Sequence, residues 1–323
     1  MDTSSIWRKF FTWRVRPADV ARDWGVLAAL ATVAALFARA HWLADLASHF
    51  AVHYLIVLAP ATAWMLWRRR WRMAGFLAVP LALNLWAVWP ALASRATTAP
   101  PDAPRVRVLG MNVLTKNSNG AQALEVIRSA GADVVVLQEI SPKWMESLAP
   151  LRETHPHVIA QPQEDNFGIA LFSRLPLERA HVFWSRNGVT PCIRAELQVA
   201  GRRVLLLAAH PPPPVGAWRT ARRNDQFGDL RDLVLAHEGP ALVVADFNAS
   251  PWNPNLRRLA REAALQFPPA VINPTWPSLA PRWLRIPIDL VLPTRHWQFA
   301  AYHTLPAFGS DHLPVLAELA LAE

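Results

Sequence analysis

The sequence contains a single cysteine, Cys192, among 323 residues. One cysteine excludes an intramolecular disulfide and a structural zinc site built from several thiolates, whatever the redox compartment. Because Cys192 lies in an alternating apolar and polar segment, residues 192–197, we expect a small buried core residue. The sequence also lacks internal repeats and long low-complexity tracts, so its length favours one large domain plus an accessory segment.

A basic excess is absent from most of the chain, although the formal net charge is +9. Residues 1–100 hold 11 Lys and Arg against 4 Asp and Glu, a balance of +7, whereas residues 101–323 hold 22 against 20, a balance of +2. This split gives little support for a dedicated nucleic-acid surface on the larger part. We interpret Arg219, Arg222 and Arg223 as a solvated helix face, although such a stretch could contact phosphates.

Three long apolar stretches, residues 24–40, 50–67 and 73–93, occupy the N-terminal third. Each approaches the roughly 20 residues that cross a bilayer, and tryptophans near their ends are typical of membrane interfaces. Three buried helices of a soluble domain are the alternative, while a cleaved signal peptide would have only one short apolar core. We therefore predict that residues 1–99 form a membrane anchor with three transmembrane helices.

Basic residues flank these stretches unevenly. Five Lys or Arg precede the first stretch and four Arg lie within residues 68–72, whereas residues 41–49 contain none. Since positively charged loops stay in the cytoplasm, we expect a multi-pass protein of the inner (plasma) membrane. Its N-terminus would be cytoplasmic, and everything after residue 93 would be periplasmic or extracellular.

A proline-rich connection at residues 100–104 marks the expected domain boundary, so residues 100–323 form the second domain. Apolar runs there predict strands, for example over 106–111 and 241–245, and amphipathic patterns predict helices such as 217–237. We expect an α+β domain of two stacked sheets with helices covering their outer faces.

Polar residues follow these predicted strands where each one ends. The clearest case is Asp246-Phe247-Asn248, directly behind the apolar run 241–245. The other residues in such positions are Asn112, Glu139, His210, Asp289, Asp311 and His312. Strand ends at a rigid sheet edge are a usual place for chemically active side chains.

Oxygen donors dominate this set, and hard oxygen ligands without cysteine suit Mg²⁺ or Mn²⁺ better than structural zinc. A metal held by few carboxylates keeps positions open for a phosphate oxygen, which indicates phosphoryl chemistry. Each residue alone could equally cap a turn or a helix. His210 and His312 could carry a proton or stabilise an oxyanion, and Asp289 could orient the imidazole of His312.

In their order along the chain, these motifs resemble the endonuclease/exonuclease/phosphatase superfamily, whose members share the DNase I-like fold. The motifs are Gly110-Met111-Asn112, Leu137-Gln138-Glu139, the segment 168–176, Ala209-His210-Pro211, Asp246-Phe247-Asn248, Ile288-Asp289 and Gly309-Ser310-Asp311-His312. The resemblance covers about residues 104–323. It implies a four-layer α/β/β/α sandwich and a divalent-metal hydrolase of phosphoester bonds, here as a membrane-anchored, bacterial-type member.

The resemblance also implies individual roles. Asn112, Glu139 and Asp311 would hold Mg²⁺ or Mn²⁺. Asn248 would bind the phosphate or position the nucleophile, and Arg194 would contact the phosphate unless it forms a surface salt bridge instead.

The remaining roles are catalytic. Asp246 would align or deprotonate the attacking water, and Asp289 would orient His312, which stabilises the transition-state charge. His210 would protonate the leaving oxygen.

Three functions follow from these expectations. The leading one is a membrane-anchored, metal-dependent phosphodiesterase or nuclease whose partner is a phosphoester substrate, nucleic acid or phospholipid, with no obligate protein partner evident. The second is a phosphodiesterase of the same fold that acts on phospholipid or sphingomyelin headgroups. The third is an inactive module that binds phosphate ligands, against which the complete set of acid, base and metal groups argues.

Overall fold

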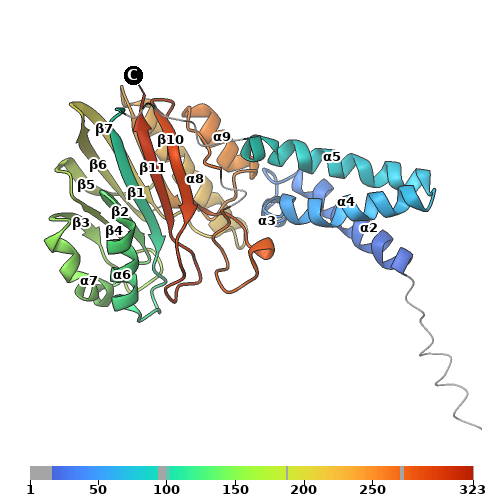
Figure 1. The fold of residues 1–323 in the computed structure, drawn as a ribbon, viewed down its shortest axis with the longest axis horizontal. Coiled ribbons are helices and arrows are strands. Elements are labelled where there is room, and N and C mark those ends of the chain that lie inside the picture. The colour runs from blue at the N-terminus through green and yellow to red at the C-terminus, as the bar shows by residue number, and fades with distance from the viewer. Residues whose placement is uncertain (1–16, 94–99, 101, 187, 270–272, 323) are drawn as a thin grey trace, which may run out of the picture.

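The computed structural model describes residues 17–93, 100, 102–186, 188–269 and 273–322. Figure 1 shows a two-sheet domain from which a narrower arm of helices projects. Four of the basic residues used to predict the membrane topology, at positions 8, 9, 14 and 16, lie outside the described residues, as does the segment 94–99 beside the predicted domain boundary.

Two mixed sheets form the body of the domain. The first has six strands in the order β10-β11-β1-β2-β4-β3, and the second has five in the order β5-β6-β7-β8-β9. The first sheet comprises β1 (Arg105–Asn112), β2 (Val134–Gln138), β3 (His157–Gln161), β4 (Ile169–Ser173), β10 (Trp297–Thr304) and β11 (Val315–Leu321). The second comprises β5 (Leu177–Trp184), β6 (Pro191–Val199), β7 (Arg202–Ala209), β8 (Ala241–Asp246) and β9 (Asp289–Pro293).

Alternating side chains fix the layers, because successive residues of a strand point to opposite faces. Leu242 and Val244 of β8 belong to the core between the sheets, whereas Val243 and Ala245 pack on the helices outside. Helices α8 (Ala217–Leu235) and α9 (Pro254–Glu262) cover the second sheet. Helices α6 (Gly120–Ala130) and α7 (Pro142–Ser147), followed by the 3₁₀ turn η1 (Ala149–Glu153), cover the first. The expected α/β/β/α sandwich is present.

Parallel pairing brings the carboxyl ends of several strands to one edge of the sandwich. β1 pairs with β2 so that Asn112 lies beside Gln138, and β7 pairs with β8 so that Ala209 lies beside Ala245. β8 pairs with β9 in antiparallel register, which places Asp246 opposite Asp289. The polar residues that follow these strands therefore emerge close together.

The arm contains α2 (Pro17–Ala35), α3 (Trp42–Ser48), α4 (Ala51–Trp67) and α5 (Trp71–Ala93). Among the described residues, α5 alone is a single helix long and apolar enough to cross a membrane, and α3 with α4 passes the same test as one span bent by 65°. The expectation of three spanning helices is therefore not met. The first predicted stretch fails because its helix ends at Ala35 and its first two turns carry Asp19, Arg22 and Asp23.

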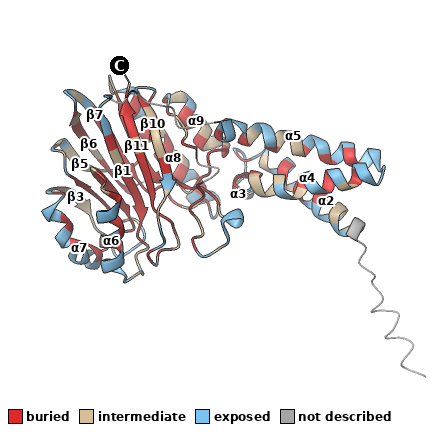
Figure 2. Ribbon diagram, viewed as in Figure 1, coloured by how far each residue is buried: buried red, intermediate tan, exposed pale blue. Residues whose placement is uncertain are grey.

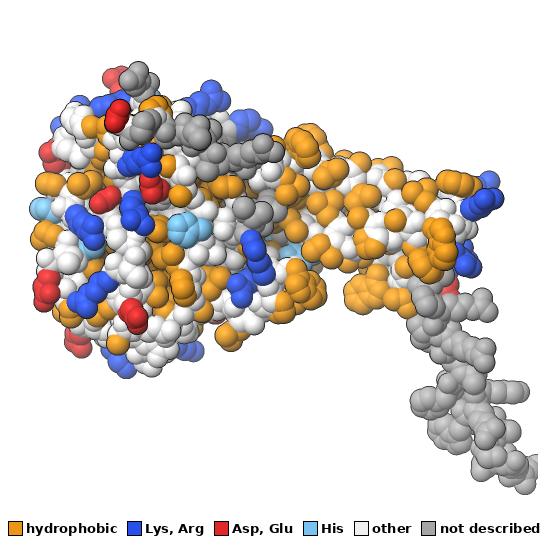
Figure 3. All heavy atoms as spheres, in the orientation of Figure 1, with side chains coloured by type: hydrophobic (Ala, Val, Ile, Leu, Met, Phe, Trp, Pro, Cys, Tyr) orange, Lys and Arg blue, Asp and Glu red, His pale blue; other side chains and the backbone are white. Residues whose placement is uncertain are grey.

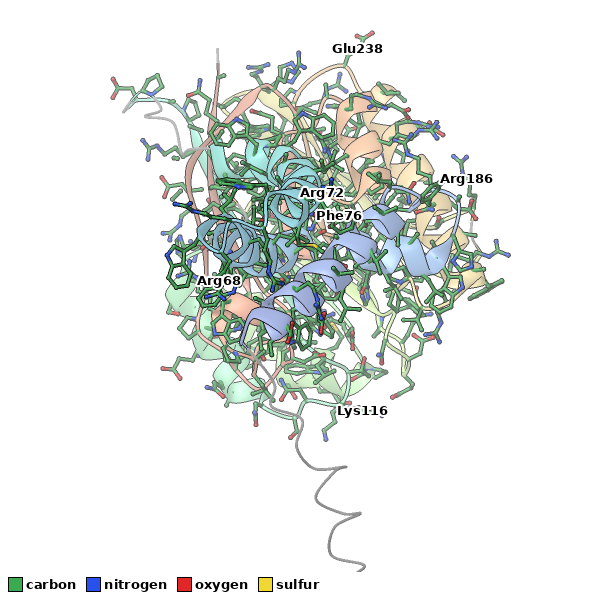
Figure 4. The ribbon with its side chains drawn as sticks, turned by 90° about the vertical axis from the view of Figure 1, so that its right-hand side faces the viewer. Arg68, Arg72, Phe76, Lys116, Arg186 and Glu238 are labelled. Atoms are coloured by element: carbon green, nitrogen blue, oxygen red, sulfur yellow. The ribbon has the colours of Figure 1, made fainter. Side chains whose placement is uncertain are left out.

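Large apolar side chains cover the outside of this arm. Only 28% of the apolar window of α5 is buried, unlike the core helix of a soluble bundle. Figure 2 shows much of the outer arm as exposed, and Figure 3 shows hydrophobic side chains along it with basic side chains at its far end. Arg68 and Arg72, which flank the turn between α4 and α5, lie at that tip in the end-on view of Figure 4.

One arginine departs from the sequence interpretation. Arg219 is exposed and Arg222 partly exposed on α8, but the Arg223 guanidinium is completely buried. The solvated helix face predicted for this stretch is therefore wrong at Arg223, because the arm covers it.

Candidate active site and metal centre

Asn112 lies at the centre of the converging strand ends. Its amide nitrogen is 3.1 Å from Glu139 Oε1 and 3.1 Å from Asp246 Oδ2, and all three residues are buried. Its Oδ1 accepts a hydrogen bond from the Leu114 backbone. The ends of β1, β2 and β8 thus bring one amide and two carboxylates into direct contact.

Glu139 occupies a strained turn after β2. Its φ is +62°, a conformation that costs a non-glycine residue about 1–3 kcal/mol. Hydrogen bonds hold the turn on both sides. Glu139 Oε2 accepts from the Thr115 backbone amide at 3.0 Å. The next residue, Ile140, donates its N–H to the Gly168 carbonyl and accepts from the Gln163 N–H. A Cβ at Gly168 would lie 1.8 Å from the Ile140 carbonyl oxygen, so only glycine fits there.

Asp246 and Asn248 form a second tight turn at the end of β8. The backbone N–H of Asn248, at φ +47°, donates to Asp246 Oδ1 at 2.9 Å, and its side-chain amide donates to the Pro211 carbonyl at 3.0 Å. His210 Nε2 lies 3.4 Å from Asp246 Oδ2, and its Nδ1 is buried without a hydrogen-bond partner in the part of the chain that the structure describes. The three side chains therefore share one wall of the site.

His312 is held by Asp289. Its Nδ1 lies 2.9 Å from Asp289 Oδ2 and 3.1 Å from Oδ1, while its Nε2 faces Asp246 Oδ2 at 3.7 Å. Ser310 fixes the loop, because its hydroxyl accepts from the His312 backbone and donates to the Asn112 carbonyl. One imidazole nitrogen is thus oriented by a carboxylate, and the other points into the cluster.

The buried ionisable groups shift one another's pKa values strongly. Burial alone would lower the pKa of His312, but the carboxylates of Asp289 and Asp246 outweigh burial and raise it to about 10. Burial would likewise raise the pKa of Asp246, but the neighbouring His312 and His210 lower it to about 2. The pKa of His210 is raised, because the Asp246 carboxylate outweighs its burial. Burial, with Asp246 nearby, raises the pKa of Asp289. Of the two carboxylates, Asp246 is therefore the one that keeps its charge in acid.

A divalent cation fits the donor chemistry of this edge. Asp311 carries a buried carboxylate oxygen, Oδ1, with no hydrogen-bond partner among the described residues, while its Oδ2 accepts from the Trp276 indole at 3.2 Å. The carboxylate oxygens of Glu139 and Asp246 approach each other across a single amide. Clustered carboxylate oxygens without sulfur are the ligands that Mg²⁺ and Mn²⁺ prefer.

A second grouping of potential ligands overlaps the first. Atoms of Asp246, Asp289 and His312 lie within 4.8 Å of one another, so this buried group could also bind a metal. The hydrogen bond between His312 and Asp289, however, uses the imidazole as a donor to a carboxylate. We therefore regard these two as an oriented pair beside the candidate metal position.

Arg194 lies apart from the cluster. On β6 it falls in the set of alternate residues that face away from the inter-sheet core, and its guanidinium lies 3.5 Å from Glu196. All the other predicted site residues are brought together, with Asp311 at the rim, where its side chain is 43% exposed.

Several supporting residues escaped the sequence analysis. Thr115 donates to Glu139, Thr275 accepts from the Asp289 backbone, and the Tyr302 hydroxyl donates to the Asp289 carbonyl. Phe167 packs its ring 5.8 Å from that of His210. Thr115, three residues after Asn112, is the one member that proximity to a motif could have indicated.

The fold and this arrangement define the class of DNase I-like two-sheet domains. The chain belongs to the Endonuclease/Exonuclease/phosphatase family, which it matches over residues 109–312, more than half of its length. Members of this family are hydrolases that act on phosphoester bonds, generally with a divalent metal. No curated protein matches the chain significantly.

Solved structures support the same fold. The human Nocturnin catalytic domain with bound sulfate is 18% identical, with 72% of this chain and 99% of that chain covered and a TM-score of 0.57. An endonuclease/exonuclease/phosphatase from Bacteroides vulgatus is 17% identical, with 67% and 99% covered and a TM-score of 0.58. Sphingomyelinase C from Streptomyces griseocarneus is 19% identical, with 68% and 100% covered and a TM-score of 0.51.

Proposed function

We propose that this protein is a membrane-anchored phosphodiesterase that uses Mg²⁺ or Mn²⁺ and a water molecule to cleave phosphodiester bonds. One observation carries the proposal: Asp246 Oδ2 lies within 3.7 Å of Asn112, His210 and His312. The Asp246 carboxylate therefore lies next to both histidines and next to Asn112, one of the proposed metal ligands. Membership of a family of phosphoester hydrolases supports the same reaction class.

Asp246, His312 and His210 have different roles in the proposed reaction. With a pKa of about 2, Asp246 is a weak base, so it orients the attacking water more than it deprotonates it. The raised pKa of His312 keeps its imidazole positive at neutral pH, where it stabilises the developing phosphate charge. His210, also with a raised pKa, donates a proton to the leaving oxygen. Asn248 positions the phosphate with its amide.

Glu139 and Asp311 would hold the cation beside this group. Asn112 would join them through Oδ1 once its amide turns from the carboxylates to which its nitrogen donates here. When bound, it supplies Lewis-acid polarisation of a phosphate oxygen and neutralises its charge. Asp311 is suited to this role because one of its oxygens is buried and accepts no hydrogen bond from any described residue.

The arm supports membrane anchoring. At 23 residues, α5 is about 35 Å long, enough for a hydrocarbon core of about 30 Å. The basic tip at Arg68 and Arg72 would stay in the cytoplasm. With α4 as a return crossing and α3 docked on the catalytic domain outside the membrane, the catalytic domain would face the periplasm or the exterior, as would the site.

A lipid headgroup is a second candidate substrate, which one cavity favours. A space of about 530 Å³ lies between α4 and the catalytic domain, next to the segment that leads into Asp289. It is lined by the apolar residues Val52, Ile56, Trp252, Pro274, Trp283 and Pro287 and by Arg282 and Arg285. Apolar walls beside guanidinium groups suit an acyl chain and a phosphate.

The test uses the full chain in detergent micelles with Mg²⁺, Mn²⁺ or EDTA. Its substrates are duplex and single-stranded DNA, RNA, sphingomyelin or phospholipid vesicles, and phosphomonoesters. EDTA should abolish turnover, and Asp246→Asn should lower kcat by about 10²–10⁴-fold without unfolding the chain. Wild-type rates in Asp246→Asn would refute the mechanism. Metal-independent binding without turnover on any substrate would indicate the inactive binding module instead.

A further inference from the structure

The arm is joined to the catalytic domain by a buried ion pair. Asp45 on α3 accepts two hydrogen bonds from Arg223 on α8, at 2.8 Å and 2.6 Å, and both side chains are completely buried. Bidentate pairing of this kind fixes orientation as well as distance. His49 Nε2 adds a contact to the same carboxylate at 3.4 Å.

The same short helix holds the loop that leaves the active site. The Ser250 backbone N–H donates to His49 Nδ1 at 3.2 Å, and the Trp252 indole donates to the His49 carbonyl at 2.7 Å. The Asn253 side chain donates to Ser48 Oγ at 2.9 Å. Every one of these loop residues is buried.

Further contacts extend the junction at both ends. Asn255 donates to Asp45 at 2.9 Å, and Arg257 lies over the Trp86 ring at 5.5 Å from its centre. Arg223 also reaches back toward the site, with NH1 3.5 Å from the Asn248 carbonyl oxygen. The arm therefore contacts the loop after Asn248 at Ser250, Trp252 and Asn253, and the start of α9 at Asn255.

Asn248 is the residue on which this arrangement acts. Its backbone adopts φ +47°, and its side chain faces Pro211 and His210. Asparagine tolerates this left-handed conformation better than other non-glycine residues, and its neighbours here hold it in that conformation. Asp246 holds its backbone N–H at 2.9 Å and Pro211 holds its side-chain amide at 3.0 Å, while Arg223, paired with Asp45, lies 3.5 Å from its carbonyl oxygen.

We propose that α3 is a structural part of the active site and that Asp45, acting through Arg223, is a positioning residue for Asn248. This inference rests on the role proposed for Asn248 in the phosphodiesterase reaction. If Asp45 is removed, the Arg223 charge stays buried without its carboxylate, so the arm and the loop should loosen together. The arm is then more than a tether, because catalysis needs it docked.

The experiment compares Asp45→Asn with Asp225→Asn in the full chain in detergent micelles. Asp225 is a matched control because it lies on the same helix, two residues from Arg223, with a 43% exposed side chain. With bis(p-nitrophenyl) phosphate and Mg²⁺, Asp45→Asn should lower kcat about 10- to 100-fold and leave KM within about twofold, as for a misplaced catalytic group. The Asp225 variant should match wild type.

A double variant separates positioning from folding. Asp45→Asn with Arg223→Gln leaves no unpaired buried charge, so its melting temperature should recover toward wild type while kcat stays low. Recovery of both the melting temperature and kcat in the double variant would overturn the proposal. A kcat of Asp45→Asn equal to that of wild type would also overturn it.

Hydrogen exchange gives a readout that does not depend on turnover. The backbone amides of residues 248–250, 252, 253 and 255 should exchange at least about tenfold faster in Asp45→Asn than in Asp225→Asn. If wild type hydrolyses nothing, the proposed function fails, yet faster exchange still supports the coupling of arm and loop. Unchanged exchange overturns that coupling whatever the activity.

Discussion

His312 Nδ1 lies 2.9 Å from Asp289 Oδ2, although the two residues come from different elements, the loop before β11 and the first position of β9. Both are buried, so neither can exchange this partner for water. The contact fixes the ring, and it also sets the charge of His312, because the Asp289 carboxylate is the largest of the interactions that raise its pKa.

Asp289→Asn should therefore move the pH dependence of hydrolysis. The raised pKa of about 10 keeps the imidazolium through neutral pH, and loss of the Asp289 charge lowers that pKa. The alkaline limb of kcat should shift to lower pH, with kcat at pH 8 reduced by about 10²-fold or more. A pH–rate profile of each form measures this. An alkaline limb at the wild-type pH would show that His312 does not carry the titration.

His210→Ala should affect substrates according to their leaving groups. If His210 protonates the leaving oxygen, alkyl phosphodiesters should lose about 10²–10⁴-fold in kcat. Diesters of p-nitrophenol should lose much less, because p-nitrophenolate departs without a proton. His303→Ala, at an exposed position of β10, serves as the control. Equal losses on both substrate types would assign His210 to binding instead.

Most of the catalytic domain follows from local pattern. The apolar run at 241–245 predicts β8 because a short buried strand needs little else, and its end at Asp246 fixes where the side chain emerges. Parallel neighbours then bring Asn112 and Glu139 to the same edge. The convergence of these residues could therefore be predicted, because the strands are recognisable in the sequence and neighbouring parallel strands end at the same edge of a sheet.

The arm and its junction were harder to predict. Hydropathy measures apolar content but not helix ends, so the break after Ala35 was missed. The burial of Arg223 depends on Asp45, 178 positions away, and neither residue stands out within its own segment. Arg194 forms an ion pair with Glu196, one of the two alternatives expected for it. Its face on the sheet could be assigned only once the register of the neighbouring strands was known.

Cys192 should be unreactive in the folded protein. Burial raises the pKa of its thiol to about 12, although the Gln226 amide lies 2.8 Å from the sulfur. At pH 8 only about one thiol in ten thousand would then be thiolate, the reactive form. A chromogenic disulfide reagent should release no colour within minutes from the native chain and one equivalent after unfolding in guanidinium. Rapid reaction of the native chain would place Cys192 at an accessible position.

An inert native cysteine makes the membrane topology measurable with single introduced cysteines. Lys116 on the catalytic domain and Arg70 at the arm tip are both exposed. If the domain faces the periplasm or exterior, an impermeant maleimide should label Lys116→Cys in intact cells, after opening of any outer membrane, and should label Arg70→Cys only after detergent lysis. Wild type controls for Cys192. The opposite labelling would reverse the orientation, and labelling of both in intact cells would mean that the arm does not cross the membrane.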